Sequence, residues 1–99
     1  MTLAQVRGTV VSTCKEEKLE GIRFLLVEKL DPPTMKGTGE FVVAMDAAGA
    51  GPEEVVFYVT GSSSRMTAVT DGRPSDAAIT AIVDEVVLSG RTVYRKKGN

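Results

Sequence analysis

The side chains of this sequence that could do covalent chemistry are serines, one cysteine and carboxylates. The segment Gly61-Ser62-Ser63-Ser64-Arg65 resembles the G-x-S-x-G turn that presents a nucleophilic serine, but Arg65 stands where the last glycine belongs. The chain has no histidine, the residue that most often accepts the proton of such a nucleophile. We therefore interpret this segment as a hydroxyl-rich turn with Arg65 in an ion pair, and a contact with an anion or solute is the alternative.

Metal chemistry is limited by the same composition. A structural zinc site needs four nitrogen or sulfur ligands, and one chain offers only Cys14 and no histidine. Cys14 cannot form an internal disulfide, which favours an intracellular protein. Six carboxylates lie beside expected strand or helix ends, where solvated or capping acids are typical: Asp46, Glu53, Glu54, Asp76, Asp84 and Glu85. The sequence thus predicts no catalytic residue, no cofactor and no metal, and the protein is not expected to be an enzyme.

A glycine-rich segment, Ala48-Gly49-Ala50-Gly51, follows an expected strand and invites comparison with a phosphate-binding loop. Two details oppose that reading. The third glycine of G-x-G-x-x-G would fall at Glu54, and the following residues are typical of a strand instead of a helix. The adjacent carboxylates of Glu53 and Glu54 would also repel a phosphate. We predict a turn that needs a positive φ or a close approach of the backbone.

Length and composition predict one folded domain over residues 1–99. Of the 99 residues, 42% are hydrophobic and 25% are charged, which is typical of a folded protein with a small core, so self-association is a reasonable expectation. The net charge of −1, 5% aromatic residues and absence of tryptophan disfavour nucleic-acid binding. No signal-like N-terminus or membrane-length apolar run is found, so we expect a cytoplasmic protein that binds no membrane.

The N-terminal part of the chain is patterned as strands. Residues 3–13 alternate between apolar and polar side chains, and Gly8 within them indicates a bend or bulge. Residues 22–27 form a second expected strand, which Pro32 and Pro33 end. The loop expected over residues 31–39 is the strongest candidate for a mobile segment because it holds two prolines and two glycines.

Two later segments, residues 40–46 and 54–60, are apolar on both faces, which suggests central strands or a subunit interface. Pro74, Ser75 and Asp76 resemble a helix start. A short helix is expected from the spacing of Ala78, Ile79, Ile82, Val83 and Val86. Residues 91–95 are expected to form a last strand that pairs back onto the sheet. This order predicts a mainly β fold, a small OB-like β-barrel of about five strands with one short helix before the last strand, and a β-sandwich is the alternative.

These motifs, taken in order, resemble a known family: the pentameric vertex proteins of bacterial microcompartments (EutN/CcmL-like). The family includes the ethanolamine-utilisation N protein and the carboxysome vertex protein. The matching segments cover nearly the whole chain: residues 3–13, 21–27, 46–51 and 61–65, then 76–79 and 82–84. The sequence departs from many relatives at Pro52 and Ser64.

The resemblance implies a structural shell protein, a β-barrel protomer that forms a homopentamer and caps the vertices of an icosahedral shell around encapsulated enzymes. Its implied partners are its own copies and the hexameric and trimeric shell proteins, and its implied location is the shell of a microcompartment in the cytoplasm. A ring needs two different complementary patches on each protomer. We expect the first hypothesised group to pack against a neighbour and the second to lie near the interface or central pore: Gly49, Ala50, Gly51 and Glu53, then Ser62, Ser63, Ser64 and Arg65.

Two other functions stay open at this stage. One is an OB-like binding module for single-stranded nucleic acid or a small ligand, which a salt-dependent affinity for single strands would indicate. The other is a small hydrolase, which has the least support because no pair of nucleophile and base is present.

Overall fold

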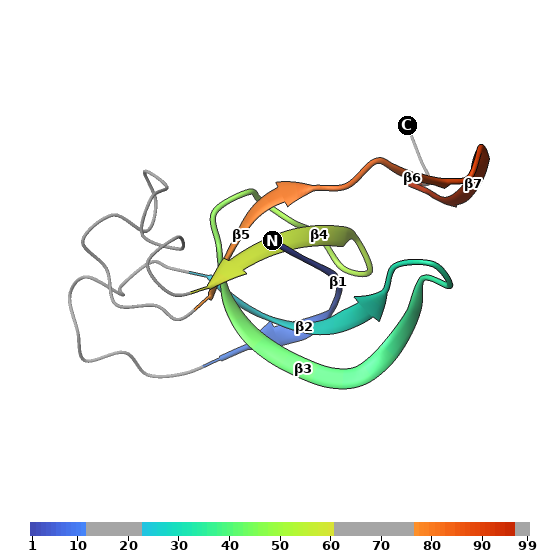
Figure 1. Cartoon of the computed structure of the whole chain (residues 1–99). Helices are drawn as coiled ribbons and strands as arrows, with labels where there is room; N and C mark the ends of the chain where they lie inside the picture. Colours follow the sequence, from blue (N-terminus) through green and yellow to red (C-terminus); the bar gives the residue numbers. More distant parts are fainter. Residues whose placement is uncertain (12–22, 61–76, 97–99) are drawn as a thin grey trace.

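The structure is a computed structural model, and it describes residues 1–11, 23–60 and 77–96. Seven strands follow one another along these residues (Figure 1): β1 (Thr2–Val10), β2 (Phe24–Asp31), β3 (Lys36–Asp46), β4 (Val55–Thr60), β5 (Ala77–Ile82), β6 (Glu85–Leu88) and β7 (Arg91–Arg95). The helix start expected at residues 74–76 and the serine-rich turn at residues 61–65 lie outside the described part.

Five strands close a barrel in the order β1-β2-β3-β5-β4, with β4 pairing back onto β1. All pairs are antiparallel except β3 and β5, which run parallel where Met45 lies beside Ala78 and Asp46 beside Ile79. The expected small OB-like barrel is therefore confirmed, and the alternative of a β-sandwich is wrong.

Side chains of β1 alternate between the barrel interior and the solvent. Ala4 and Val6 are buried while Arg7 and Thr9 are exposed, as the period of a half-buried strand requires. The register against β2 shifts between Val6 and Gly8, so the bulge expected at Gly8 is confirmed.

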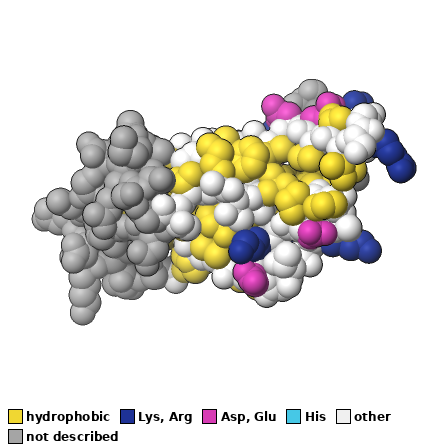
Figure 2. All heavy atoms as spheres, viewed as in Figure 1, with side chains coloured by type: hydrophobic (Ala, Val, Ile, Leu, Met, Phe, Trp, Pro, Cys, Tyr) yellow, Lys and Arg dark blue, Asp and Glu magenta, His cyan; other side chains and the backbone are white. Residues whose placement is uncertain are grey.

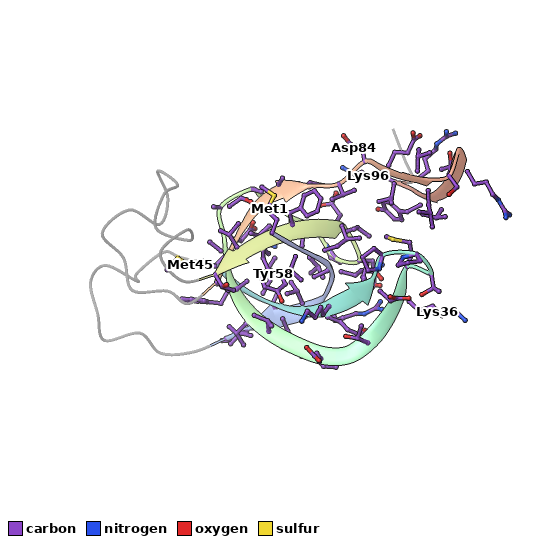
Figure 3. All side chains as sticks on the ribbon, viewed as in Figure 1. Met1, Lys36, Met45, Tyr58, Asp84 and Lys96 are labelled. Atoms are coloured by element: carbon purple, nitrogen blue, oxygen red, sulfur yellow. The ribbon has the colours of Figure 1, made fainter. Side chains whose placement is uncertain are left out.

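The core inside the barrel consists mostly of aliphatic side chains, and every barrel strand contributes to it. The largest fully buried ones are Leu25, Met45, Ile79, Val6, Val27, Val55 and Val56. A second cluster joins Leu3, Leu30, Val55 and Val83, and Val86 and Tyr94 pack against it. Figure 3 shows the side chain of Tyr58 within the barrel, whereas those of Asp84 and Lys96 lie at the base of the β6–β7 hairpin.

The turn between β2 and β3 is shorter than expected. Pro32 and Pro33 do end β2, but β3 begins at Lys36, and Gly37 pairs with Leu30 across the hairpin. The prediction that the loop extends to Gly39 is therefore wrong. Its two glycines favoured a loop, but Gly37 is needed within the strand pair, because an added Cβ there would collide with the Glu28 side chain.

The short helix expected from Ala78 to Val86 is also wrong for the described residues. Ala77, Ala78 and Ile79 are consecutive buried residues of β5, which pairs with β4 along its length and with β3 at its start. A strand covered on both faces loses its alternating pattern, and its apolar run then imitates helical spacing.

Residues Arg91–Arg95 form the expected strand β7, but it does not pair back onto the barrel. It pairs with β6 in a separate two-stranded sheet. Figure 1 shows this hairpin projecting beyond the barrel, at the upper right of the view. The expectation that β3 is covered on both faces is likewise not met in one copy, because Phe41 and Val43 are about half exposed.

Candidate subunit interface

The loop between β3 and β4 is held by the carboxylate of Asp46. Its Oδ1 accepts hydrogen bonds from the backbone N–H groups of Ala48 (3.1 Å), Gly49 (2.9 Å) and Ala50 (3.2 Å), and its Oδ2 accepts from Ala50 at 3.1 Å. The Asp46 side chain is only 3% exposed. A buried carboxylate that accepts this many N–H bonds fixes the loop in one conformation.

Arg23, the residue directly before β2, also holds this loop. Its Nη2 donates to the carbonyl oxygen of Ala50 at 2.7 Å and lies 3.8 Å from Asp46 Oδ2. The guanidinium thus partly balances the charge of the buried Asp46 carboxylate while it holds the far side of the turn.

The conformation of the turn agrees with its sequence. Gly49 has a φ of +76°, so the expected positive-φ turn is confirmed at that residue. The methyl group of Ala50 is fully buried in the core of its own chain. The N–H groups of residues 48–50 are already bonded to Asp46, so they do not form an anion cradle, which is a physical reason why a phosphate loop does not form here.

Glu54 joins the end of the loop to the C-terminal segment. Its Oε1 accepts a hydrogen bond from the Gly51 N–H, and its Oε2 lies 2.8 Å from Lys96 Nζ. The hydrogen bond from Lys96, followed by that from Gly51, lowers the pKa of Glu54 below its usual 4.5, and the same pair raises the pKa of Lys96. The Lys96 N–H also donates to the Asp84 carbonyl at 2.8 Å, which ties both ends of the hairpin together.

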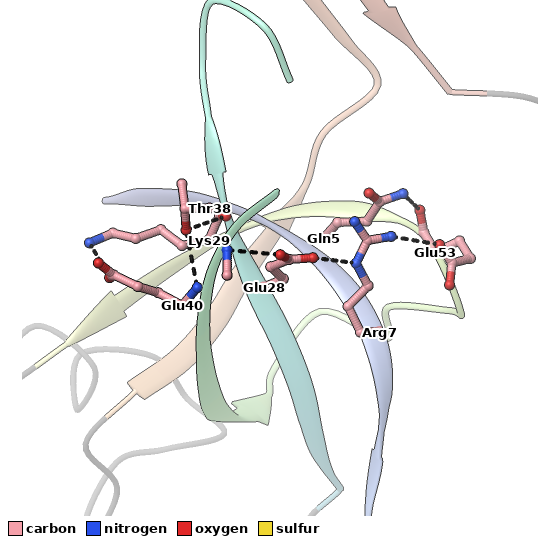
Figure 4. A network of polar contacts seen from close by, with 8 residues as sticks. Gln5, Arg7, Glu28, Lys29, Thr38, Glu40 and Glu53 are labelled. Carbon is pink, nitrogen blue, oxygen red and sulfur yellow. Dashed lines mark hydrogen bonds and ion pairs between the residues drawn. The ribbon is translucent and has the colours of Figure 1, made fainter. Parts of the chain in front are cut away.

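A row of polar contacts continues across the outside of the barrel (Figure 4). Arg7 lies between two carboxylates, with Nε at 2.8 Å from Glu28 Oε1 and Nη1 at 3.1 Å from Glu53 Oε2. The Gln5 amide donates to the Glu53 carbonyl at 2.8 Å. Hydrogen bonds from Arg7 and from the Gly39 N–H lower the pKa of Glu28. The loop is therefore linked to β1 and β2 as well.

The outer end of this row lies on the β2–β3 hairpin. Lys29 Nζ lies 3.2 Å from Glu40 Oε2, and the Thr38 hydroxyl donates to the Lys29 carbonyl at 2.9 Å. The Gly39 N–H donates to Glu28 Oε2 at 3.0 Å. These contacts cross from β2 to β3 where the register of the two strands shifts between Glu28 and Leu30, and they hold the pair together.

A groove of about 570 Å³ separates the loop from β7. Its walls include Gln5, Pro52, Glu53, Glu54, Tyr94 and Lys96. The loop that sequence analysis singled out and the C-terminal strand therefore border one surface depression. Sequence analysis did not identify Arg23, Asp46 or Lys96 as residues that position it. An aspartate at a strand end, before small residues, was the available signal for Asp46, because such a side chain often accepts nearby N–H bonds.

The hypothesised interface residues of the β3–β4 loop differ in their exposure. Gly49 is exposed, Ala50 is buried within its own chain, and the Glu53 side chain is 64% exposed while it binds Arg7. Within residues 1–11, 23–60 and 77–96, no three His, Cys, Asp or Glu side chains gather as metal ligands. The same residues contain no helix that is long and apolar enough to cross a membrane.

Fold and surface together define a class: a small OB-like β-barrel whose ordered loop and charged contacts stabilise its shape. Comparison with known proteins identifies the family. Residues 1–84 match the family model described as "Ethanolamine utilisation protein EutN/carboxysome". The chain belongs to the EutN/CcmL family.

Curated relatives match over nearly their whole lengths. The carboxysome shell vertex protein CcmL of Synechococcus elongatus is 45% identical over 97 residues, covering 98% of this chain and 97% of the relative. The bacterial microcompartment shell vertex protein EutN of Escherichia coli K12 is 38% identical over 96 residues, covering 97% and 100%. These relatives are structural shell proteins, so the expectation of a non-enzymatic member of this family is confirmed, and the hydrolase and binding-module alternatives are not favoured.

Solved structures agree with the fold. CcmL of Gloeobacter violaceus superimposes with a TM-score of 0.91 at 39% identity, covering 99% of this chain and all of that one. The GrpN pentameric microcompartment shell protein of Rhodospirillum rubrum gives a TM-score of 0.79 at 40% identity, covering 89% and 99%.

Proposed function

We propose that this chain forms a closed homopentamer that caps the vertices of a bacterial microcompartment shell, where it contacts hexameric and trimeric shell proteins. The observation that carries the proposal is the match, along nearly the whole chain, to shell vertex proteins and to a pentameric shell protein. A closed barrel that leaves few free strand edges also suits a rigid wedge-shaped protomer.

The ordered β3–β4 loop supports a role at the subunit contact. Gly49 and the Glu53 side chain are exposed, and four N–H contacts to Asp46 together with Arg23 prevent the loop from rearranging. In this proposal the backbone of Gly49 and Gly51 and the Glu53 side chain face the neighbouring copy, and Ala50 supports them from within the core. Residues 62–65 contribute to the same interface or to the central opening.

Native mass spectrometry of the purified protein tests the assembly. A mass near five times 10.5 kDa is expected, and a stable monomer would contradict the proposal. Gly51→Trp should abolish the ring, because its side chain would occupy the contact, whereas the matched control Val11→Trp, at a side chain that is 94% exposed, should leave the ring intact.

Contacts with other shell proteins need a second experiment. Mixing the purified ring with a hexameric shell protein should produce closed polyhedral particles visible by electron microscopy, with this chain present in them. Particles that close equally well without the ring would contradict the vertex role.

A further inference from the structure

A small cavity lies between the end of β1, the start of β2 and the β3–β4 loop. It has a volume of about 220 Å³ and is distinct from the groove beside β7, with which it shares Pro52. Its walls come from a single copy of the chain and include Val6, Arg7, Gly8, Arg23, Leu25 and Pro52. Neither the fold nor the proposed ring assigns a role to this cavity.

Gly8 leaves room for a ligand in the cavity. It lies at the bulge of β1, where the register against β2 shifts. A Cβ added at Gly8 would meet no atom of the described residues within 4 Å, so the space that a side chain would fill is open. A glycine inside a strand often marks a place where a ligand approaches the backbone closely. The missing side chain at this position therefore shapes the cavity.

Apolar side chains form the walls on either side of Gly8. Val6 and Leu25 belong to the hydrophobic core, and Pro52 closes the cavity from the β3–β4 loop. Small-molecule sites combine such walls with a few polar groups, and they occur at the mouths of β-barrels. An apolar cavity of about 150 Å³ is large enough for benzene. The cavity at Gly8 can therefore hold a molecule about the size of a six-membered ring.

Arg23 supplies the hydrogen-bond donors of the cavity. Its Nη2 donates to the Ala50 carbonyl at 2.7 Å and lies 3.8 Å from Asp46 Oδ2. Its Nε and Nη1 form no hydrogen bond with the residues that the structure describes, and its side chain is 55% exposed. A guanidinium group donates hydrogen bonds and cannot accept them, so a ligand at Arg23 must present an acceptor oxygen.

The carboxylates near the cavity disfavour a charged ligand. Arg7, in the cavity wall, is held between Glu28 and Glu53 (Figure 4), and Arg23 lies beside Asp46. Three carboxylates thus surround two guanidinium groups, and an anionic ligand would add a fourth negative charge. An ammonium group would instead lie against the two guanidinium groups of the walls. An uncharged acceptor avoids both costs.

The wider surface has mixed charge as well. On the face drawn in Figure 2, acidic and basic side chains lie close to one another, and no broad patch of one sign is visible. A surface of this kind does not concentrate small ions by a long-range field. Recognition at the cavity therefore depends on shape and on the donors of Arg23.

We propose that this cavity binds a small uncharged molecule with an apolar body and one carbonyl oxygen, a ketone or an amide. The apolar body packs against Val6 and Leu25 and fills the space at Gly8, while the carbonyl oxygen accepts a hydrogen bond from Nε or Nη1 of Arg23. Because all these groups belong to one copy, binding does not require the ring.

Three matched probes test the class of ligand. Cyclohexanone has the proposed body and carbonyl oxygen, whereas cyclohexanecarboxylate and cyclohexylammonium carry the same ring with a negative or a positive charge. In an NMR titration of the intact protein at neutral pH, cyclohexanone should shift the amide signals of Gly8 and Leu25 saturably, with a dissociation constant in the millimolar range. Each charged probe should bind about tenfold more weakly or worse.

Two variants test the location of the site. Gly8→Val places a side chain in the open space, at a residue without a positive φ, and should abolish the shifts caused by cyclohexanone. Arg23→Met removes the donors and should weaken binding about tenfold. Lys36→Met is the matched control, because it removes an exposed cation outside the cavity and should leave binding unchanged.

Thermal unfolding without ligand shows whether each variant folds. If Arg23→Met unfolds because Arg23 also holds the β3–β4 loop, Gly8→Val and the charged probes still decide the question. The proposal is overturned if cyclohexanone causes no saturable shift at Gly8, or if Gly8→Val leaves the shifts unchanged. Equal affinity for the carboxylate would overturn the uncharged class. None of these results depends on the mass of the ring, so a failure here leaves the proposed vertex function intact.

Discussion

Both carboxylate oxygens of Asp46 accept a hydrogen bond from the backbone N–H of Ala50. The Ala50 nitrogen lies 3.2 Å from Oδ1 and 3.1 Å from Oδ2. Asp46 is the last residue of β3, and Ala50 buries its methyl group in the core. The hydrogen bonds between them therefore hold the loop against the barrel. The geometry of the proposed interface therefore depends on a side chain that is itself buried.

Asp46→Ala should lower the free energy of unfolding by about 3 kcal/mol, because it leaves several N–H groups without acceptors. Urea denaturation measures the change. Asp31→Ala is the control, since Asp31 is exposed and, among the described residues, its carboxylate accepts only the Thr34 hydroxyl, so the substitution should cost about 0.5 kcal/mol or less. Equal effects of the two substitutions would contradict the anchoring role.

Gly49→Ala should destabilise the protein by about 1 kcal/mol through backbone strain alone. The added Cβ would meet no atom within 4 Å, but the φ of +76° disfavours any L side chain. Gly8→Ala offers the matched control, because its Cβ is equally free and its φ is not positive. There the loss of unfolded-state freedom should stabilise by about 0.5 kcal/mol. Thermal unfolding of both variants should give shifts of opposite sign.

The pair of Glu54 and Lys96 should contribute stability that depends on pH. The folded-state pKa of Glu54 is lowered, so its contribution is complete above its usual value of 4.5 and is lost as the pH falls through the lowered value. For Lys96, whose folded-state pKa is raised, the contribution is complete below 10.5 and is lost as the pH rises through the raised value.

A double-mutant cycle measures that pair directly. Glu54→Gln and Lys96→Met should show a favourable coupling at pH 7, and this coupling should disappear at a pH below the lowered pKa of Glu54. A coupling that persists unchanged in acid would show that the two side chains interact by packing instead of charge.

Arg7→Ala should return the pKa of Glu28 toward 4.5, because the hydrogen bond from Arg7 is the largest cause of its lowering. A carbon-detected NMR titration of the Glu28 carboxyl group measures the change. Lys29→Ala is the control. Lys29 is the residue next to Glu28, but its ammonium group pairs with Glu40, so its removal should move the pKa of Glu28 much less. If both variants shifted it equally, the specific contact with Arg7 would not be its cause.

Structural features that depend on a single strand or turn could be predicted from the sequence. Alternation in β1 predicted the common face of Ala4 and Val6 and the opposite face of Arg7 and Thr9. Gly8 predicted the bulge in this strand and Gly49 predicted a positive φ, because each feature depends on neighbours along the chain. The absence of histidine excluded histidine-dependent catalysis from composition alone.

Features that depend on residues far apart in the sequence were decided by the tertiary structure. Ala77–Ile82 is a strand because β3 and β4 flank it, although its spacing favours a helix, and β7 pairs with β6 alone because the barrel is already closed by β4 on β1. The partners of Asp46 and Glu54 likewise come from loop and C-terminal residues that no local pattern brings together. Residue types determined which contacts were available, and closure of the barrel determined which of them formed.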